Sequence, residues 1–330
     1  MKTLLQLALL ISLILYLPDC DLQTETETDL TPPAIPTGLV IVAEHSGDGQ
    51  IMLSWNANSE RDFDRYRIYR SLAGDVADQY NQLAETQATT YVDAGLEYTV
   101  DYYYRISAID ENDNESERSA AVHIIPININ PPQTPANFRV YGYNLPNGNP
   151  YIDLRWSANS ETDLDYYAIY RDTIGLFPTD AARLLQTVTV NYYIDENVTV
   201  GQKLYYKLIA VDRGGMTSNP TGVQSDLPLA VPVLSQPANN STLTATPPTF
   251  IWNISPNATK YKLIVRLSQQ SDEFWTREVT QPTSGTTVTL PMPTTPALAS
   301  ARSYYWQVAA YSSNNSEVNS YSLIWKFTTP

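Results

Sequence analysis

The chain of 330 residues is too long for one small domain and has the length of two or three ordinary domains. Hydrophobic residues make up 43% of it, with 24 Tyr and 6 Trp, which excludes a wholly disordered chain and favours β-strands. The formal net charge of −15 argues against nucleic acid as a partner, because phosphate backbones are bound by Lys and Arg.

Residues 1–19 have the pattern of a secretory signal peptide. Lys2 precedes an apolar run from Leu4 to Leu17, which ends at Pro18 and Asp19. This run is shorter than the about 20 apolar residues that a membrane-spanning helix needs, although an anchoring helix stays open as an alternative. Cys20, the only cysteine, follows directly, so no disulfide can form within one chain.

The position of Cys20 after the apolar run resembles a bacterial lipoprotein signal, in which cleavage leaves a lipid-modified cysteine as the first residue. The resemblance implies lipidation of Cys20 and an extracytoplasmic protein held on the outer membrane or the cell surface by its acyl chains. An ordinary signal peptide with an incidental thiol is the alternative. Residues 20–31 alternate Thr and Glu and contain little to bury, so we expect an acidic tether there.

The rest of the chain contains internal repeats. The segment WNANSERDFDRYRIYR at 55–70 returns as WSANSETDLDYYAIYR at 156–171, and YYYRISAID at 102–110 returns as LYYKLIAVD at 204–212. A diverged third copy contains FIWN at 250–253, YKLIVRL at 261–267 and YYWQVAAY at 304–311. Proline clusters separate the copies, which indicates three successive units.

The repeated segments alternate apolar and polar residues with a period of two, which predicts strands rather than helices. Asp48-Gly49 precedes the predicted strand that ends at Trp55, and Asn147-Gly148 precedes the one that ends at Trp156. These dipeptides tolerate positive φ, so we expect hairpin turns there. Short strands spaced by turns are typical of an antiparallel sandwich.

These residues resemble the fibronectin type III domain, over nearly all of residues 32–329. A leading proline, a tryptophan that ends the second strand and a late strand of the form Tyr-x-Tyr/Trp-x-hydrophobic-x-Ala carry the resemblance. Tyr102 and Tyr304 match the family's corner tyrosine, whereas Leu204 replaces it in the second copy, so the bond from that hydroxyl to the backbone should be missing there.

The resemblance implies an all-β fold of three tandem fibronectin type III or immunoglobulin-like antiparallel β-sandwiches arranged as a rod. We expect domain 1 at residues 32–128, domain 2 at 131–229 and a diverged domain 3 at 230–330. The third copy lacks the D-x-D loop, so a related sandwich of another subfamily stays open for it.

Paired carboxylates are the first candidates for chemistry. Asp62 and Asp64 have the spacing of a glycoside hydrolase pair if they lie in an extended segment. Asp163 and Asp165 repeat the pair, which favours turn capping in a shared loop over catalysis or a calcium site. Residues 110–115, DENDNE, lack the Gly and Glu of a calcium loop and are interpreted as a polar hairpin tip.

Aromatic residues outside the repeated positions are the candidates for ligand binding. Trp275 has no counterpart in the other copies, and if Phe274 and Trp275 lie in a strand one of them faces outward. Exposed rings stack on sugars and are enriched at protein interfaces, so both residues are predicted ligand-binding candidates. Packing in the core or at a sheet edge of the third unit is the alternative.

The sequence therefore predicts a non-enzymatic extracytoplasmic lipoprotein that serves as a binding, adhesion or spacer module. A carbohydrate-binding accessory lipoprotein, and a scaffold component of a surface or secretion complex, are the alternatives. We expect a protein or polysaccharide partner at the cell surface and a membrane contact through the lipid anchor. No catalytic residue, metal or cofactor is predicted, because the chain contains no nucleophile, phosphate-loop or metal-ligand motif.

Overall fold

The computed structural model describes residues 29–312 and 317–330. This part of the chain contains β-strands and two short 3₁₀ helices, η1 (Ala43–His45) and η2 (Ala77–Gln79), and no α-helix. The strands form six sheets, two in each of three successive units. The predicted all-β fold of tandem β-sandwiches is confirmed.

The first unit consists of a three-stranded and a four-stranded antiparallel sheet. The three-stranded sheet has the order β1 (Val40–Ile41), β2 (Gln50–Ser54), β5 (Thr90–Ala94). The four-stranded sheet has the order β4 (Asn81–Thr86), β3 (Phe63–Ser71), β6 (Tyr102–Asp110), β7 (Val122–Ile124).

The second unit repeats this division. Its three-stranded sheet has the order β12 (Tyr192–Asp195), β9 (Tyr151–Arg155), β8 (Arg139–Tyr143). Its four-stranded sheet has the order β11 (Leu184–Val188), β10 (Leu164–Asp172), β13 (Leu204–Asp212), β14 (Gln224–Asp226).

The third unit has the same plan with two additions. Its smaller sheet has the order β15 (Leu234–Gln236), β17 (Thr249–Asn253), β20 (Thr287–Pro291). Its larger sheet has the order β16 (Ser241–Thr242), β23 (Trp325–Thr328), β21 (Ser303–Tyr311), β18 (Lys260–Arg266), β19 (Glu273–Thr280), and β22 (Ser320–Tyr321) also pairs with β21. The β16–β23 pair is parallel, which departs from the expected purely antiparallel sheets.

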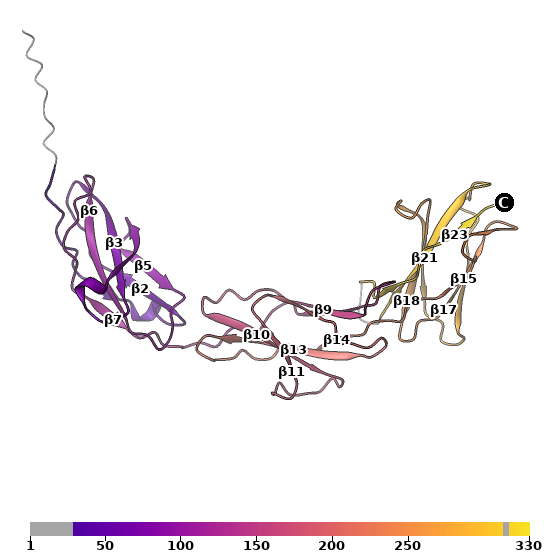
Figure 1. The fold of residues 1–330 in the computed structure, drawn as a ribbon, viewed down its shortest axis with the longest axis horizontal. Helices are drawn as coiled ribbons and strands as arrows, with labels where there is room; N and C mark the ends of the chain where they lie inside the picture. Colours follow the sequence, from indigo (N-terminus) through magenta and orange to yellow (C-terminus); the bar gives the residue numbers. More distant parts are fainter. Residues whose placement is uncertain (1–28, 313–316) are drawn as a thin grey trace, which may run out of the picture.

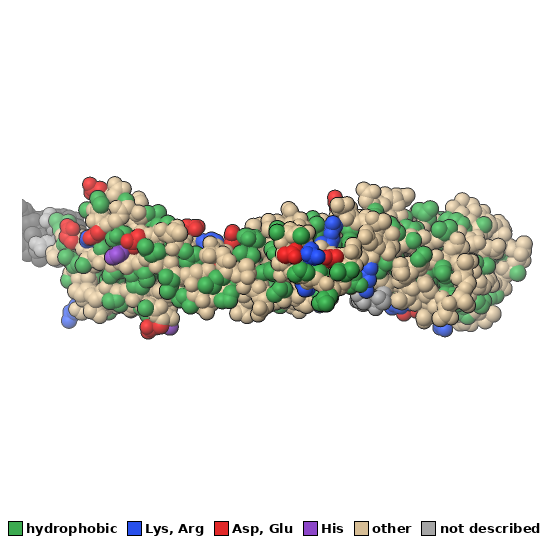
Figure 2. Space-filling model, turned by 90° about the horizontal axis from the view of Figure 1, so that it is seen from below, with side chains coloured by type: hydrophobic (Ala, Val, Ile, Leu, Met, Phe, Trp, Pro, Cys, Tyr) green, Lys and Arg blue, Asp and Glu red, His purple; other side chains and the backbone are tan. Residues whose placement is uncertain are grey.

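The three units follow one another end to end in chain order, with the first and third units at the two ends (Figure 1). The chain of units is bowed in that view and nearly straight when turned by 90° (Figure 2). On the face shown in Figure 2, acidic and basic side chains lie beside one another over the first two units and form no broad patch of one sign.

The same aromatic pair lies in the core of every unit. Trp55, Trp156 and Trp252 are 5%, 4% and 0% exposed. Each tryptophan ring makes an edge-to-face contact with a tyrosine ring. The centroid distances are 5.3 Å to Tyr66, 5.2 Å to Tyr167 and 5.7 Å to Tyr261, in the order of the tryptophans. Each pair joins the two sheets of its sandwich, because Trp55 and Trp156 directly follow β2 and β9 and Trp252 lies in β17, whereas the tyrosines lie in the larger sheets.

The corner tyrosines behave as the resemblance implies. The amide of Glu97 donates to the Tyr102 hydroxyl at 2.9 Å, and the amide of Ala299 donates to the Tyr304 hydroxyl at 2.8 Å. Leu204, the counterpart in the second unit, is 4% exposed and fills the position with apolar packing alone. The predicted hairpin turns are also present, since Asp48 and Asn147 have φ of 49° and 64°.

A buried polar seam joins the second and third units. Asp226, at the end of β14, accepts hydrogen bonds from the Gly142 amide at 2.8 Å, the Asn319 side-chain amide at 2.8 Å and the Ser312 hydroxyl at 2.7 Å. Asn319 also donates to the Gly142 carbonyl at 2.8 Å. Asp226 and Asn319 are both 1% exposed, so the seam excludes solvent and fixes the third unit on the end of the second.

We expect Asn319→Ala to loosen this junction and to lower the free energy of unfolding by about 3 kcal/mol, because buried partners of Asn319, one of them a carboxylate, lose a hydrogen bond. Urea unfolding gives the free energy, and small-angle scattering measures whether the angle between the units broadens. Gln269→Ala, an exposed position in the third unit, is the matched control. An Asn319→Ala protein with wild-type stability and scattering would contradict the assignment of a fixed junction.

Candidate functional site

The outer face of the three-stranded sheet of the second unit carries a groove of about 640 Å³. The alternation of β8 points Val140 inward and Arg139, Tyr141 and Tyr143 outward. The alternation of β9 likewise turns its odd-numbered residues outward. The groove is lined by the following residues of the second unit and one residue of the third: Asn137, Arg139, Tyr141, Tyr143, Asp153, Arg155, Trp156, Ser157 and Glu317.

The register of the strands sets the order of the side chains across this face. Tyr143 is opposite Tyr151, and their rings stack at a centroid distance of 5.1 Å and an interplanar angle of 28°. Tyr141 is opposite Asp153, and Tyr192, on β12, extends the aromatic surface beside Arg155 with 55% of its surface exposed. Tyrosine rings with free edges and hydroxyls offer both stacking surface and hydrogen-bond groups.

The charged groups of the groove are only partly neutralised by one another. Asp153 pairs with Arg155 at 2.8 Å. Arg139 is exposed and forms no ion pair within the described residues. A ligand in the groove would therefore meet flat rings, a guanidinium with free donors and a paired carboxylate, which is the mixture that hydroxyl-rich ligands require.

Glu317 and burial set the protonation of one groove tyrosine. Burial raises the pKa of Tyr143 to about 12, and the negative charges of Glu317 and Asp153 add to the rise. The Tyr143 hydroxyl therefore keeps its proton at neutral pH and stays a hydrogen-bond donor.

The corresponding faces of the other two units differ. On β2 the outward residues are Gln50, Met52 and Ser54, and on β17 they are Thr249, Ile251 and Asn253. Neither strand presents an outward tyrosine, although both belong to the same kind of sheet. The aromatic groove is a property of the second unit and does not follow from the repeated scaffold.

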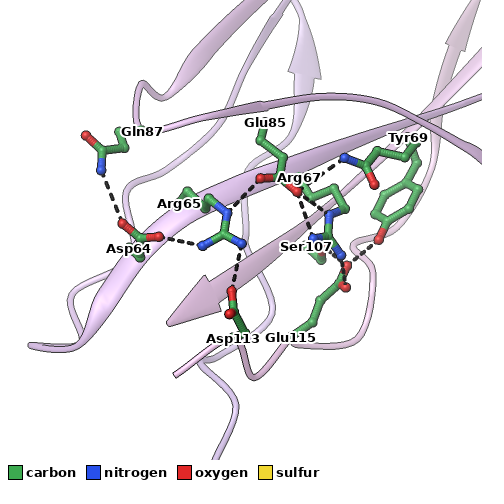
Figure 3. A network of polar contacts seen from close by, with 10 residues as sticks. Asp64, Arg65, Arg67, Tyr69, Glu85, Gln87, Ser107, Asp113 and Glu115 are labelled. Carbon is green, nitrogen blue, oxygen red and sulfur yellow. Dashed lines mark hydrogen bonds and ion pairs between the residues drawn. The ribbon is translucent and has the colours of Figure 1, made fainter. Parts of the chain in front are cut away.

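A second polar surface, on the four-stranded sheet of the first unit, is a weaker candidate (Figure 3). Arg65 pairs with Asp64 at 2.5 Å, Glu85 at 2.7 Å and Asp113 at 2.8 Å, and hydrogen bonds to Asp113, Asp64 and Glu85 raise its pKa. Arg67 pairs with Glu85 and Glu115. Both guanidinium groups are occupied within the protein, so this network covers a sheet face and offers little free charge to a ligand.

Phe274 and Trp275 lie differently from the expectation. The β18–β19 register shifts between Val265 and Arg266, so Trp275 pairs with Val265 while Phe274 is the extra residue of a β-bulge. Both rings are half-buried against the core of the third unit, with Trp275 stacked 6.3 Å from Phe250 and Phe274 5.4 Å from Tyr304. The expectation that one ring faces outward is wrong, because the bulge breaks the alternation. Their role in ligand binding stays a prediction.

The Asp62–Asp64 pair does not cap its turn. Asp64 lies within β3 and pairs with Arg65, and the turn amides are bound by a different acid, with the Ser59 amide donating to Glu60 at 2.9 Å. In the second unit Asp163 is buried and accepts a hydrogen bond from the Tyr98 hydroxyl of the first unit. The turn-capping interpretation is wrong. Asp64 and Asp165 lie within β3 and β10, and among the described residues no turn amide donates to the carboxylate of Asp62 or Asp163.

Cys20, the predicted lipidation site, lies outside the described residues. Among the residues that the structure describes, no helix has the length and hydropathy needed to cross a membrane.

The chain is similar in sequence to parts of several carbohydrate-active proteins. Exoglucanase B of Cellulomonas fimi is 26% identical over 207 residues, which is 58% of this chain and 17% of that protein. An amylopullulanase of Thermoanaerobacterium saccharolyticum is 38% identical over 93 residues, which is 28% of this chain and 7% of that protein. An exo beta-1,2-glucooligosaccharide sophorohydrolase (non-reducing end) of Parabacteroides distasonis is 38% identical over 69 residues, which is 21% of this chain and 9% of that protein. The chain thus spans less than a fifth of each relative.

A family profile described as a Domain of Unknown Function, DUF928, matches residues 213–323. Among solved structures, the FN1-FN3 domains of chicken CNTN1 are 16% identical, cover 91% of this chain and 99% of that one, and give a TM-score of 0.34. A Fn3-like protein from Clostridium thermocellum is 26% identical, covers 30% of this chain and 99% of that one, and gives a TM-score of 0.25. Both solved structures consist of fibronectin type III or Fn3-like domains.

The raised pKa of Tyr143 predicts a pH effect on stability. Its folded value of about 12 lies above the ordinary value of 10.0, so this contribution is fully present below about pH 10 and is lost as pH rises through about 12. Titration of labelled tyrosine rings by nuclear magnetic resonance, with Tyr143→Phe to assign the signal, measures this value. Glu317→Gln should lower it and Glu97→Gln, in the first unit, should not; a Tyr143 signal that titrates near pH 10 would contradict the assignment.

Proposed function

We propose that this chain is a non-catalytic, exported binding protein whose second unit holds a polysaccharide in the tyrosine groove. The observation that carries the proposal is the row of outward rings, Tyr141, Tyr143 and Tyr151, beside unpaired Arg139. Sugar rings present flat apolar faces and hydroxyl edges, and this surface has partners for both. Two carboxylates, Asp153 and Glu317, line the groove, and Asp153 is paired with Arg155, so the groove lacks the two free carboxylates of a glycosidase.

The similar proteins support the same class of ligand. Their names describe enzymes that act on glucans or related saccharides, and the shared segments are small parts of those enzymes. We infer that the shared part is the accessory, sandwich-type part, and that here it acts without a catalytic domain in the same segment. Polysaccharide at the cell surface is therefore the proposed partner.

The first and third units determine where the groove lies along the chain of units. With domain 1 at 32–128, domain 2 at 131–229 and domain 3 at 230–330, the end-to-end arrangement places the second unit between the first and the third (Figure 1). An anchor at Cys20 and the acidic tether would then hold the groove clear of the membrane surface. The spacer role and the binding role are in this way two parts of one function.

The test of the groove is binding of a soluble fragment, residues 31–330, to a panel of glucans and other polysaccharides. Tyr141→Ala and Tyr143→Ala should each weaken binding about tenfold, because each removes a stacking ring. Tyr103→Ala, on the first unit, is the matched control and should leave affinity unchanged. Loss of binding in Trp275→Ala alone would move the site to the third unit and contradict the groove, and a fragment that binds no polysaccharide would overturn the proposal.

The anchor is tested on whole cells. Cys20→Ser should release the protein from the membrane fraction and abolish incorporation of labelled fatty acid, because the thiol is the predicted acylation site. Thr24→Ser, in the tether, should leave both unchanged. A Cys20→Ser protein that stays fully membrane-bound would show that another segment holds it.

A further inference from the structure

The junction between the first and second units is rich in carboxylates. Asp48, in the first hairpin turn, accepts hydrogen bonds from the amides of Ile129 and Asn130 at 2.7 and 2.9 Å, and so fixes the linker. Across the junction the Tyr98 hydroxyl donates to Asp163, which is 3% exposed. Negative charges of both units therefore converge on the linker between them.

Two buried oxygens at this junction have no hydrogen-bond donor. Asp212 is 2% exposed, and its Oδ1 accepts from the Asn128 side-chain amide at 2.9 Å and from the Met216 amide at 2.8 Å. Its Oδ2 is buried without a partner, and so is the Oδ1 of Asn128. An unsatisfied buried acceptor costs about 1–3 kcal/mol, and more when it is charged, so a positive group at this point would be strongly favoured.

The nearest guanidinium does not supply that charge. Arg213 donates from Nη2 to the Thr162 carbonyl at 2.6 Å. No carboxylate of the described residues lies within ion-pair distance of Arg213, and its Nε is itself buried without a partner. The side chain is held over the first unit's turns, where it lies near Gly49 and Gly95.

The first unit shows how the same position is satisfied by the protein alone. Asp110 corresponds to Asp212 in the repeat, and its Oδ1 accepts from the Asn114 amide at 2.8 Å, as the Oδ1 of Asp212 does from Met216. The Asn114 side chain donates a further hydrogen bond to Asp110 Oδ2 at 2.8 Å. Because Met216 stands where the first unit has Asn114, the second unit lacks this donor.

The backbone around the two positions is otherwise the same. The Glu111 amide donates to the Asp62 carbonyl and the Arg213 amide donates to the Asp163 carbonyl, both at 2.8 Å. In the first unit this geometry brings carboxylate oxygens of Asp29, Asp62 and Asp110 within 4.8 Å of one another. The corresponding positions of the second unit hold Asn128, Asp163 and Asp212, so an amide stands in place of one carboxylate, and Asn128 contacts Asp212 directly.

We propose that Asn128, Asp163 and Asp212 bind a calcium ion that ties the linker to the second unit. Two carboxylates and an amide oxygen are hard oxygen ligands, and calcium accepts irregular sets of such ligands completed by water, whereas magnesium demands a near-octahedral set. The ion would satisfy Asp212 Oδ2 and Asn128 Oδ1 together and would hold Asp163 in place to receive Tyr98. This site lies apart from the tyrosine groove, and the inference does not rest on the proposed function.

The inference differs from the expectation that the chain holds no metal. The sequence pattern of a calcium loop is absent here because the three oxygens come from a linker and two loops separated in the chain. Asp62 and Asp64, the pair that the sequence singled out, do not form the site.

The test is calorimetric titration of the full-length protein in detergent with calcium chloride. Wild type should bind one ion. Met216→Asn should weaken binding at least tenfold, because the introduced side-chain amide would donate a hydrogen bond to Asp212 Oδ2, as Asn114 does to Asp110 in the first unit, and so would compete with the ion. Asp212→Asn should do the same. Met216 is partly exposed, so its variant tests the site even if Asp212→Asn folds poorly, and circular dichroism checks the fold of each.

The control is Asp62→Asn, in the acidic cluster of the first unit, which should leave the affinity unchanged. Calcium binding that is lost in Asp62→Asn and kept in Met216→Asn and Asp212→Asn would overturn the proposal. So would the absence of a binding heat in the wild type, since water would then satisfy both oxygens. Raised thermal stability with calcium, seen in wild type and lost in Met216→Asn, would support the link between the ion and the junction.

Discussion

The arrangement of the second and third units depends on the buried carboxylate of Asp226. A carboxylate with 1% exposure is stable only when donors surround it, and here they come from both units: the Gly142 amide on β8, and the side chains of Ser312 and Asn319. Separating the units would leave that charge without its partners. The seam therefore acts as one cooperative contact rather than as a flexible linker.

The groove inherits its geometry from this seam. Gly142, which donates to Asp226, lies in β8 between Tyr141 and Tyr143, and a side chain at that position would clash with the backbone of Leu227 at 2.3 Å. β8 thus packs Val140 into the core of the second unit, contacts Asp226 and Asn319 through Gly142, and presents its tyrosines on the outward side. Glu317 reaches the groove from the third unit, so the seam also sets the charge beside Tyr143.

Sequence reasoning located the scaffold better than the site. The core tryptophans were predictable because their position recurs in each copy, and the corner tyrosines because the late strand matches the family pattern in the first and third copies. Buried positions tolerate few alternatives. Alternation in RVYGY at 139–143 would have shown that Tyr141 and Tyr143 share a face, but it does not say whether that face is covered. Glu317 lies far along the chain from the other groove residues, and the bulge at Phe274 depends on how β18 and β19 pair. Neither the position of Glu317 in the groove nor the bulge could therefore be predicted from the local sequence pattern.

The repeated units show how one scaffold acquires different surfaces. Core positions hold the same type of residue in each unit, whereas outward positions differ between units. The outer face that carries tyrosines in the second unit carries Met52 in the first and Ile251 in the third. The loops vary in the same way, with Asn114 supplying a donor that Met216 does not. Because a sandwich tolerates such changes at little cost in stability, binding groups could accumulate in one unit while the others kept the length and direction of the rod.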